Sequence, residues 1–497
     1  MPLILALDQG TTSSRAIVFD ETGAKRSQAQ IPLPQIFPRA GWVEQGPVVM
    51  WENQLACARQ AIAEVGVTAS DITALGITNQ RETAVVWDRA TGRPLHNAIV
   101  WQDRRTADVC DALVRTGVGE RVREVTGLPI DPYFSATKIG WVLDNVEGAR
   151  AHAEAGNLAF GTVDTWFLWQ LTGGAVHATD VTNASRTLLF DIGRGEWSAE
   201  MLELFGIPAS LLPEVVASSG VVAETLPDLL GAPVPIAGIA GDQQASLVGN
   251  GCFEAGDVKA TFGTGIFALM HTGTERISTA TVATTIAASS PGALEYALEG
   301  SIFMGGAAIQ WIVEGLGLAD SPAEAQKLAE SVPDSGGVVF VPALTGLGAP
   351  EWDPLARGAI FGLTRGSTAA HVARAAMDAV ALQLGDLIAA MERESGDALH
   401  AMRADGGVTV NALVMQTLAD VLLARVDCAE MAESTALGAA YLAGRATGVW
   451  SSPDDLPMLR AVGRTYEPAP DAEHRLGDLK LRWAEAVKRS LRWERSS

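Results

Sequence analysis

The most informative hydrophobic pattern in the chain is a short apolar run that ends on an acid and a cluster of small polar residues. Residues 3–7 (LILAL) have the length and composition of a buried strand. They are followed by Asp8 and by residues 10–14 (GTTSS), whose backbone can turn tightly and present N–H groups to an anion. A second apolar run covers residues 16–19. The pattern predicts a strand, a polar hairpin and a second strand, with a carboxylate where a magnesium ion on a phosphate would need one.

The chain repeats this arrangement near its midpoint. Residues 258–270 (VKATFGTGIFALM) predict a strand, a Gly-Thr-Gly turn and a strand. One such hairpin is usually only a turn, but two of them, one opening each half of the chain, predict two related domains that close on one nucleotide. This architecture is typical of actin-like ATPases and sugar kinases. A Walker-type P-loop is excluded because the chain contains no GxxxxGK[ST] motif.

Two further apolar runs end on polar residues that could bind a substrate or accept its proton. The strand predicted at residues 72–78 leads to Arg81 and Glu82, a donor fork beside an acceptor, which suits a small polyol. The alternative, a solvated hairpin turn, would normally use Gly, Asn or Asp. The strand predicted at residues 234–240 ends at Asp242, a candidate general base. The alternative for Asp242 is an N-cap of the helix that follows.

Helical periodicity predicts several helices. The clearest are an amphipathic helix at residues 53–65, an Ala-rich helix at 368–395 and a helix of small residues at 434–444 that suits close packing. A Gly-Gly turn at 406–407 precedes a helix at 412–423, as in sites where a ligand approaches the backbone. The basic amphipathic stretch at 474–493 is interpreted as a docking helix, with membrane binding as the alternative.

Composition narrows the function classes. The 497 residues are 48% hydrophobic, which excludes a largely disordered chain. The formal net charge of −22 argues against a protein that binds nucleic acid or anionic membranes in general. The four cysteines show no CxxC spacing and are interpreted as core residues of a reducing compartment. With no signal peptide or spanning run recognised, the expected location is cytoplasmic, without stable membrane insertion.

Five motifs together carry a family resemblance. They are residues 7–15 (LDQGTTSSR), 76–83 (GITNQRET), 130–134 (IDPYF), 239–244 (IAGDQQ) and 345–354 (TGLGAPEWDP). Over essentially its full length the chain resembles the FGGY carbohydrate kinases and, within that family, the members that phosphorylate glycerol. The resemblance implies an α/β fold of two ribonuclease-H-like domains of the actin/hexokinase type, with the active site in the cleft between them. The expected domains are residues 1–250, with the acceptor and the first phosphate loop, and 251–497, with the nucleotide.

The resemblance also implies a reaction and a set of site residues. The expected activity is transfer of the ATP γ-phosphoryl group to a terminal hydroxyl of glycerol, giving sn-glycerol 3-phosphate and ADP. Asp242 would be the base. By motif, the glycerol hydroxyls would be held by Arg81, Glu82, Tyr133, Asp242 and Gln243, and its carbon edge covered by Trp101 and Phe267.

ATP and Mg²⁺ are the expected co-substrate and metal. The resemblance assigns Asp8 to magnesium through water. It assigns the nucleotide to Thr11, Thr12, Ser13 and Arg15 in the first phosphate loop, Thr264 in the second, Gly306 and Gln310 beside the nucleotide, and Gly407 and Asn411 at the adenosine.

One segment of the sequence bears on regulation. Some glycerol-phosphorylating members are activated by phosphorylation of a histidine, or inhibited by fructose 1,6-bisphosphate, near residues 218–231, but this segment contains no His, Arg or Lys. The expected assembly is a homo-oligomer, a dimer or a tetramer. Two alternatives stay open: another FGGY kinase acting on a longer sugar, and a non-catalytic actin-like ATPase.

Overall fold

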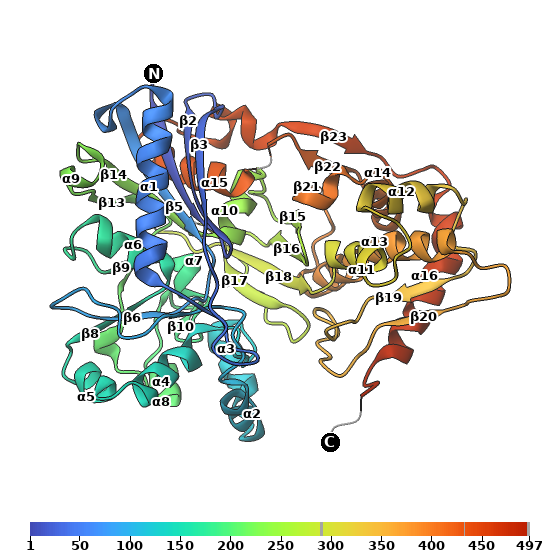
Figure 1. The fold of residues 1–497 in the computed structure, drawn as a ribbon, viewed down its shortest axis with the longest axis horizontal. Helices are drawn as coiled ribbons and strands as arrows, with labels where there is room; N and C mark the ends of the chain where they lie inside the picture. Colours follow the sequence, from blue (N-terminus) through green and yellow to red (C-terminus); the bar gives the residue numbers. More distant parts are fainter. Residues whose placement is uncertain (289–291, 432, 495–497) are drawn as a thin grey trace.

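Two large β-sheets, one in each half of the chain, organise the computed structural model, which describes residues 1–288, 292–431 and 433–494 (Figure 1). The first sheet has six strands in the order β13-β14-β5-β1-β2-β3. They are β1 (Leu3–Gln9), β2 (Ser13–Asp20), β3 (Lys25–Pro32), β5 (Ile72–Asn79), β13 (Ser219–Glu224) and β14 (Pro235–Gly241).

The second sheet has seven strands in the order β17-β18-β16-β15-β21-β22-β23. They are β15 (Asp257–Phe262), β16 (Ile266–His271), β17 (Ala283–Ile286), β18 (Tyr296–Ile302), β21 (Ala401–Asp405), β22 (Val426–Ala429) and β23 (Val462–Tyr466). The remaining strands form two-stranded pairs: β4 (Glu44–Gln45) with β7 (Ala98–Ile99), β6 (Val85–Asp88) with β8 (Leu158–Gly161), β9 (Ala178–Asp180) with β12 (Glu214–Val216), β10 (Phe190–Asp191) with β11 (Glu196–Trp197), and β19 (Val339–Val341) with β20 (Ala359–Phe361).

Helices cover both sheets. In the first half they are α1 (Pro47–Val65), α2 (Ala107–Arg115), α3 (Gly119–Thr126), α4 (Ser135–Asn145), α5 (Ala149–Glu154), α6 (Val163–Leu171), α7 (Val181–Ala184), α8 (Ala199–Phe205), α9 (Pro227–Leu230) and α10 (Asp242–Gly249). In the second half they are α11 (Gly306–Glu314), α12 (Pro322–Glu330), α13 (Ala369–Ser395), α14 (Ala412–Leu422), α15 (Ser434–Ala446) and α16 (Ala472–Ser490).

Strand pairing explains why the sequence motifs meet. β1, β5 and β14 are parallel neighbours, and the register pairs Gln9 with Asn79 and Asn79 with Gly241. Because parallel strands place their carboxyl ends at one edge, the residues that follow these strands share that edge. The second sheet repeats this plan, with a β15–β16 hairpin and Thr261 of β15 paired in parallel with Asp405 of β21. The predicted α/β fold with two related domains is confirmed.

Helix α15 connects the two halves. It belongs to the second half of the sequence but packs on β1, β5 and β14 of the first sheet, where Figure 1 shows it among the blue strands. A Cβ atom on Gly438 would overlap the carbonyl of Ala245, and one on Gly249 would overlap that of Ser434. The small residues predicted to favour close packing therefore let α10 and α15 lie backbone to backbone.

Most predicted helices are present, with one clear difference in length. α1 begins at Pro47, six residues before the predicted start at 53, because Pro47 stands at the first helical position after Gly46. The terminal helix α16 buries Leu476, Trp483 and Val487 in the core of the second half, as a docking helix should. No helix in the described part of the chain is both long and apolar enough to cross a membrane.

Candidate active site

Arg81, Glu82 and Asp242 lie together at the carboxyl edge of the first sheet. Arg81 and Glu82 follow β5 and are 3% and 1% exposed, so they are not a solvated turn. Glu82 has a φ of 61°, a backbone conformation that non-glycine residues adopt rarely and that occurs often in functional sites. Asp242 is the first residue of α10, and Gly241 occupies the N-cap position, so the alternative that Asp242 is the N-cap is wrong.

Asp242 combines a fixed carboxylate oxygen with a partly exposed one. Its Oδ1 lies 3.2 Å from Arg81 Nε and accepts the Gln243 N–H at 2.7 Å. In the described part of the chain both contacts go to Oδ1, and the side chain is 32% exposed, which leaves Oδ2 available to a hydroxyl group. Burial raises the pKa of Asp242, while the charges of Arg81 and Lys259 oppose this shift. An oriented carboxylate of raised pKa suits a general base.

Three predicted aromatic residues form one wall beside these charges. The ring of Trp101 meets the ring of Tyr133 edge-on, with centroids 5.5 Å apart, and that of Phe267 at 6.4 Å. Trp101 and Tyr133 come from loops of the first half, whereas Phe267 lies in β16 of the second sheet. Trp101 Nε1 also donates to Thr11 Oγ1 at 3.0 Å, which links the wall to the first phosphate loop. The wall is therefore shared by both halves of the chain.

Sequence reasoning missed three charged residues at this site, namely Arg186, Lys259 and Glu299. Glu299 accepts two hydrogen bonds from Arg81, at 2.6 and 2.7 Å, and Arg186 Nε donates to Glu82 Oε1 at 2.7 Å. Lys259 Nζ donates to Gln243 Oε1, and burial lowers the pKa of Lys259 to about 8. Lys259 and Glu299 each interrupt an otherwise largely apolar strand pattern, a signal that could have identified both as site candidates.

The first phosphate loop is the hairpin between β1 and β2. Gly10 N donates to Ser13 O at 3.0 Å, which closes the turn, and Thr12 is exposed at its tip. Arg15 Nη1 lies 3.6 Å from Asp8 Oδ2 across the hairpin. The structure thus places the five predicted residues Asp8, Thr11, Thr12, Ser13 and Arg15 on one hairpin.

Asp8 has surroundings that fit a magnesium-side residue. Burial raises its pKa to about 6; Arg15 lowers it, and the charges of Asp242 and Glu433 raise it further. A cation beside this carboxylate would relieve that unfavourable environment. In the described residues no group of three or more His, Cys, Asp or Glu side chains could hold a metal alone. Magnesium is commonly held by one or two carboxylates together with substrate phosphates and water, and Asp8 could supply one such carboxylate.

The second phosphate loop is built mainly from backbone. Gly305 N and Ala307 N donate to Thr264 O, at 2.9 and 3.0 Å, and tie the start of α11 to the loop. A Cβ atom on Gly306 would lie 2.7 Å from Gly263 O and 3.0 Å from Val408 Cγ2. Thr264, Gly306 and the Gly406–Gly407 turn therefore converge, as their assignment to one nucleotide requires.

Gln310 and Asn411 are placed less directly. Gln310 lies on the exposed face of α11, where its Nε2 donates to Glu314 at 2.8 Å. Asn411 is the N-cap of α14 and accepts the Val414 N–H at 3.1 Å. This cap gives Asn411 a structural role in addition to the predicted one at the adenosine.

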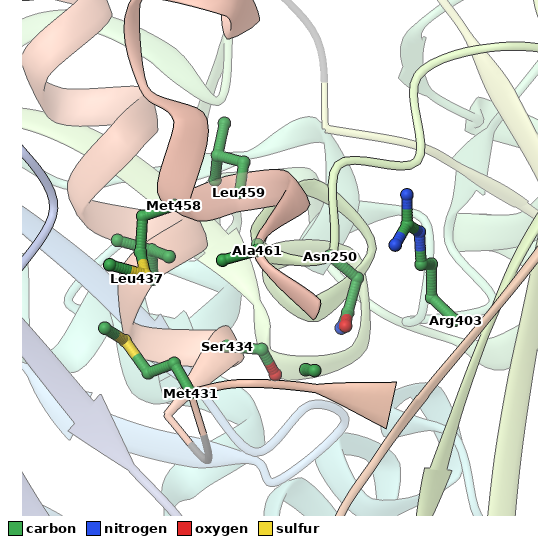
Figure 2. Close-up of a pocket in the computed structure, with 10 residues that line it drawn as sticks. Asn250, Arg403, Met431, Ser434, Leu437, Met458, Leu459 and Ala461 are labelled. Atoms are coloured by element: carbon green, nitrogen blue, oxygen red, sulfur yellow. The ribbon is translucent and has the colours of Figure 1, made fainter. Parts of the chain in front are cut away.

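A small cavity lies near the α10–α15 junction but outside the predicted site. Figure 2 shows Met431, Leu437 and Met458 on one side of it and Asn250 and Arg403 on the other. Ser434 and Asn250, which also line it, both donate to Asp405 Oδ2. The cavity contains none of the residues assigned to substrates.

Comparison with known proteins identifies the family. The model of the N-terminal domain of the FGGY family of carbohydrate kinases matches residues 3–249, and that of the C-terminal domain matches residues 258–447. The chain belongs to the FGGY family of carbohydrate kinases. It is therefore a kinase, and the alternative of a non-catalytic actin-like ATPase is wrong.

Full-length relatives include two bacterial proteins. A glycerol kinase from Polaromonas sp. strain JS666 is 54% identical over 496 residues, which cover 99% of this chain and 100% of that protein. Glycerol kinase 2 of Thermotoga maritima is 52% identical over 496 residues, which cover 100% of both chains.

Solved structures agree in fold. A Plasmodium falciparum glycerol kinase with ADP superposes with a TM-score of 0.94 at 34% identity, covering 99% of this chain and 98% of that one. A ligand-bound xylulose kinase from Lactobacillus acidophilus has a TM-score of 0.90 at 21% identity, covering 98% of both chains, and shows the fold alone.

Proposed function

We propose that this FGGY kinase transfers the γ-phosphoryl group of ATP to glycerol, forming sn-glycerol 3-phosphate and ADP. The observation that carries the proposal is the pairing of Arg81 with Glu82 and Asp242, next to the aromatic wall of Trp101, Tyr133 and Phe267. Arg186 connects the two groups, because it pairs with Glu82 at 2.7 Å and its guanidinium lies 5.8 Å from the centre of the Tyr133 ring. A three-carbon triol has hydroxyl groups for the charged side and a carbon edge for the wall. The full-length identity to glycerol kinases supports the same acceptor.

In this proposal Asp242 is the general base. Its Oδ2 accepts the proton of the terminal hydroxyl as the oxygen of that hydroxyl bonds to the γ-phosphorus and the bond to ADP breaks. Arg81 Nε holds the other oxygen, so the carboxylate is oriented before the substrate arrives. Such positioning and charge compensation are the main contributions that a protein makes to phosphoryl transfer.

The phosphates of ATP would lie between the two phosphate loops. Thr11, Thr12, Ser13 and Arg15 approach from the first sheet, and Thr264 and Gly306 from the second. Magnesium bound beside Asp8 would neutralise charge on these phosphates. Gln243, held by Lys259, would add a hydrogen-bonding partner for glycerol.

The second candidate is a longer sugar acceptor, because structures of xylulose and gluconate kinases share this fold. One assay separates the two candidates: coupled ADP release with glycerol, dihydroxyacetone, xylulose or no acceptor. We expect glycerol to support the highest kcat/KM, with glycerol 3-phosphate as product. A higher kcat/KM with xylulose would overturn the proposal.

We also propose a cytoplasmic homo-oligomer, a dimer or tetramer, which light scattering would test.

A further inference from the structure

Glu299 is a buried carboxylate in the middle of β18, a strand of the second sheet. Its side chain is 2% exposed, and its strand neighbours Leu298 and Ala297 are fully buried apolar residues. A charged side chain is rarely buried to this degree unless it is paired. Its partners therefore indicate why it is there.

Both partners of Glu299 are arginines from the first half of the chain. Arg81 Nη1 donates to Glu299 Oε2 at 2.6 Å and Arg81 Nη2 to Oε1 at 2.7 Å, the parallel two-bond geometry that orients a guanidinium most strongly. Arg186 Nη2 donates to the same Oε1 at 3.1 Å. One carboxylate of the second sheet thus fixes two side chains of the other domain.

The ring of charges closes through Glu82. Arg186 Nε donates to Glu82 Oε1 at 2.7 Å, and Arg81 Nε lies 3.8 Å from the same oxygen. The side chains of all four residues are 1–2% exposed. Two arginines and two glutamates balance in charge, so removal of Glu299 would leave a buried positive charge without its partner.

This ring determines which part of Arg81 can meet a substrate. Nη1 donates to Glu299 and, at 3.2 Å, to Gln244, while Nε faces Asp242. Nη2 carries two N–H groups, and one of them binds Glu299. The other has no hydrogen-bond partner among the described residues and lies on the same edge of the guanidinium as Nε, which is 3.2 Å from Asp242 Oδ1 and 3.8 Å from Glu82 Oε1. A hydroxyl beside Asp242 could accept it.

We propose that Glu299 is a positioning residue of the acceptor site: it acts through Arg81 and Arg186 and is a contact by which the C-terminal domain orients the charged side chains that bind the acceptor. The identity of the acceptor as glycerol rests on the function proposed above. β17, the neighbour of β18, adds a second link between the halves, since Gln244 Nε2 donates to Thr285 Oγ1 at 3.1 Å.

The test is Glu299→Gln, which keeps the side-chain volume but replaces one acceptor oxygen with a donor facing an arginine. We expect the KM for glycerol to rise about tenfold or more, with the KM for ATP unchanged within about twofold. The reason is that the guanidinium groups of Arg81 and Arg186, which lose their partner in this variant, belong to the proposed glycerol site and not to the nucleotide site. Glu299→Asp keeps the charge but is too short to reach both arginines, so its KM for glycerol should fall between those of wild type and Glu299→Gln.

The matched control is Asp378→Asn, which removes another buried carboxylate of the second half, paired with Arg374 at 2.9 Å on α13. It should lower the thermal midpoint without a selective rise in the KM for glycerol. Equal rises in both KM values in Glu299→Gln, or the same glycerol KM in Glu299→Gln and Asp378→Asn, would overturn the proposal.

Wild type is assayed first with glycerol, dihydroxyacetone and xylulose. If it prefers another acceptor, the proposed function is wrong, and the same three variants are compared on that acceptor. A selective rise in the KM of the preferred acceptor still supports the role of Glu299, and its absence still overturns it.

Discussion

On the proposed acceptor side of the site, Arg81, Glu82, Arg186 and Glu299 are charged side chains buried to 98% or more, each paired with another. On the proposed nucleotide side, the positions of Thr264, Gly306 and Gly406 depend on backbone hydrogen bonds and on the absence of side chains at the two glycines. Charged side chains can distinguish one arrangement of hydroxyls from another, whereas an N–H-lined turn accepts any polyphosphate of the right shape.

If these roles are right, substitutions on the two sides should act differently. Loss of one member of a buried ion pair costs about 3–5 kcal/mol, so changes on the acceptor side should be large and selective. Changes on the nucleotide side should instead act through steric exclusion. The two kinds of substitution should therefore be separable by which Michaelis constant they change.

The largest effect is expected from Asp242→Asn. The amide keeps the shape of the side chain but cannot accept the proton, so kcat should fall roughly 10²–10⁴-fold, with the KM for ATP nearly unchanged. Steady-state kinetics with ADP detection measures this. If the variant retained more than about a tenth of the wild-type kcat with chemistry limiting the rate, Asp242 would not be the base and Glu82 would be tested next.

Asp8→Asn should act on the metal requirement. Loss of a carboxylate beside bound magnesium should raise the magnesium concentration for half-maximal rate about tenfold, a typical effect for a group that acts on a metal indirectly. A magnesium titration at saturating ATP and glycerol measures the shift. Asp242→Asn is the control, since it should lose rate without this shift. An unchanged magnesium requirement in Asp8→Asn would remove Asp8 from the metal site.

Gly306→Ala should weaken the nucleotide side alone. The added Cβ atom would lie 2.7 Å from Gly263 O, so the second phosphate loop must shift. We expect the KM for ATP to rise about fivefold or more, from a repacking cost of 1–3 kcal/mol, with the KM for glycerol unchanged. Gly477→Ala is the steric control in the same half, because a Cβ atom there has no neighbour within 4 Å and the residue lies within helix α16. A rise in the glycerol KM alone would contradict this separation of effects.

No effect is expected from two regulators. Residues 218–231 form β13 and α9 at the edge of the first sheet and contain no His, Arg or Lys. A phosphohistidine carrier protein should neither label nor activate the enzyme, as radiolabel transfer would show. Fructose 1,6-bisphosphate at sub-millimolar levels should not inhibit it. Clear inhibition at these concentrations would overturn the second expectation.

The sequence predicts the nucleotide side of this molecule better than the acceptor side. Hairpins such as residues 258–270 leave a local pattern, because the glycines and the strands that flank them are adjacent in the chain. The pairing of Arg81 with Glu299 joins residues 218 positions apart, and Arg186 lies in no regular element. Nothing local identifies these partners, although a glutamate or lysine inside an apolar strand does indicate that a buried partner exists. The packing of α15 on the first sheet also joins residues far apart in the sequence, so no local pattern predicts it.

Glu82→Gln tests most directly the central claim that buried charges select the acceptor and backbone selects the nucleotide. The substitution keeps the shape of the side chain and removes the charge that pairs with Arg186 at 2.7 Å. The measurement is the pair of Michaelis constants, for glycerol and for ATP, from one set of initial rates. We expect the KM for glycerol to rise about tenfold or more and the KM for ATP to stay within about twofold of wild type. Equal rises in both constants, with a normally folded enzyme, would contradict the claim.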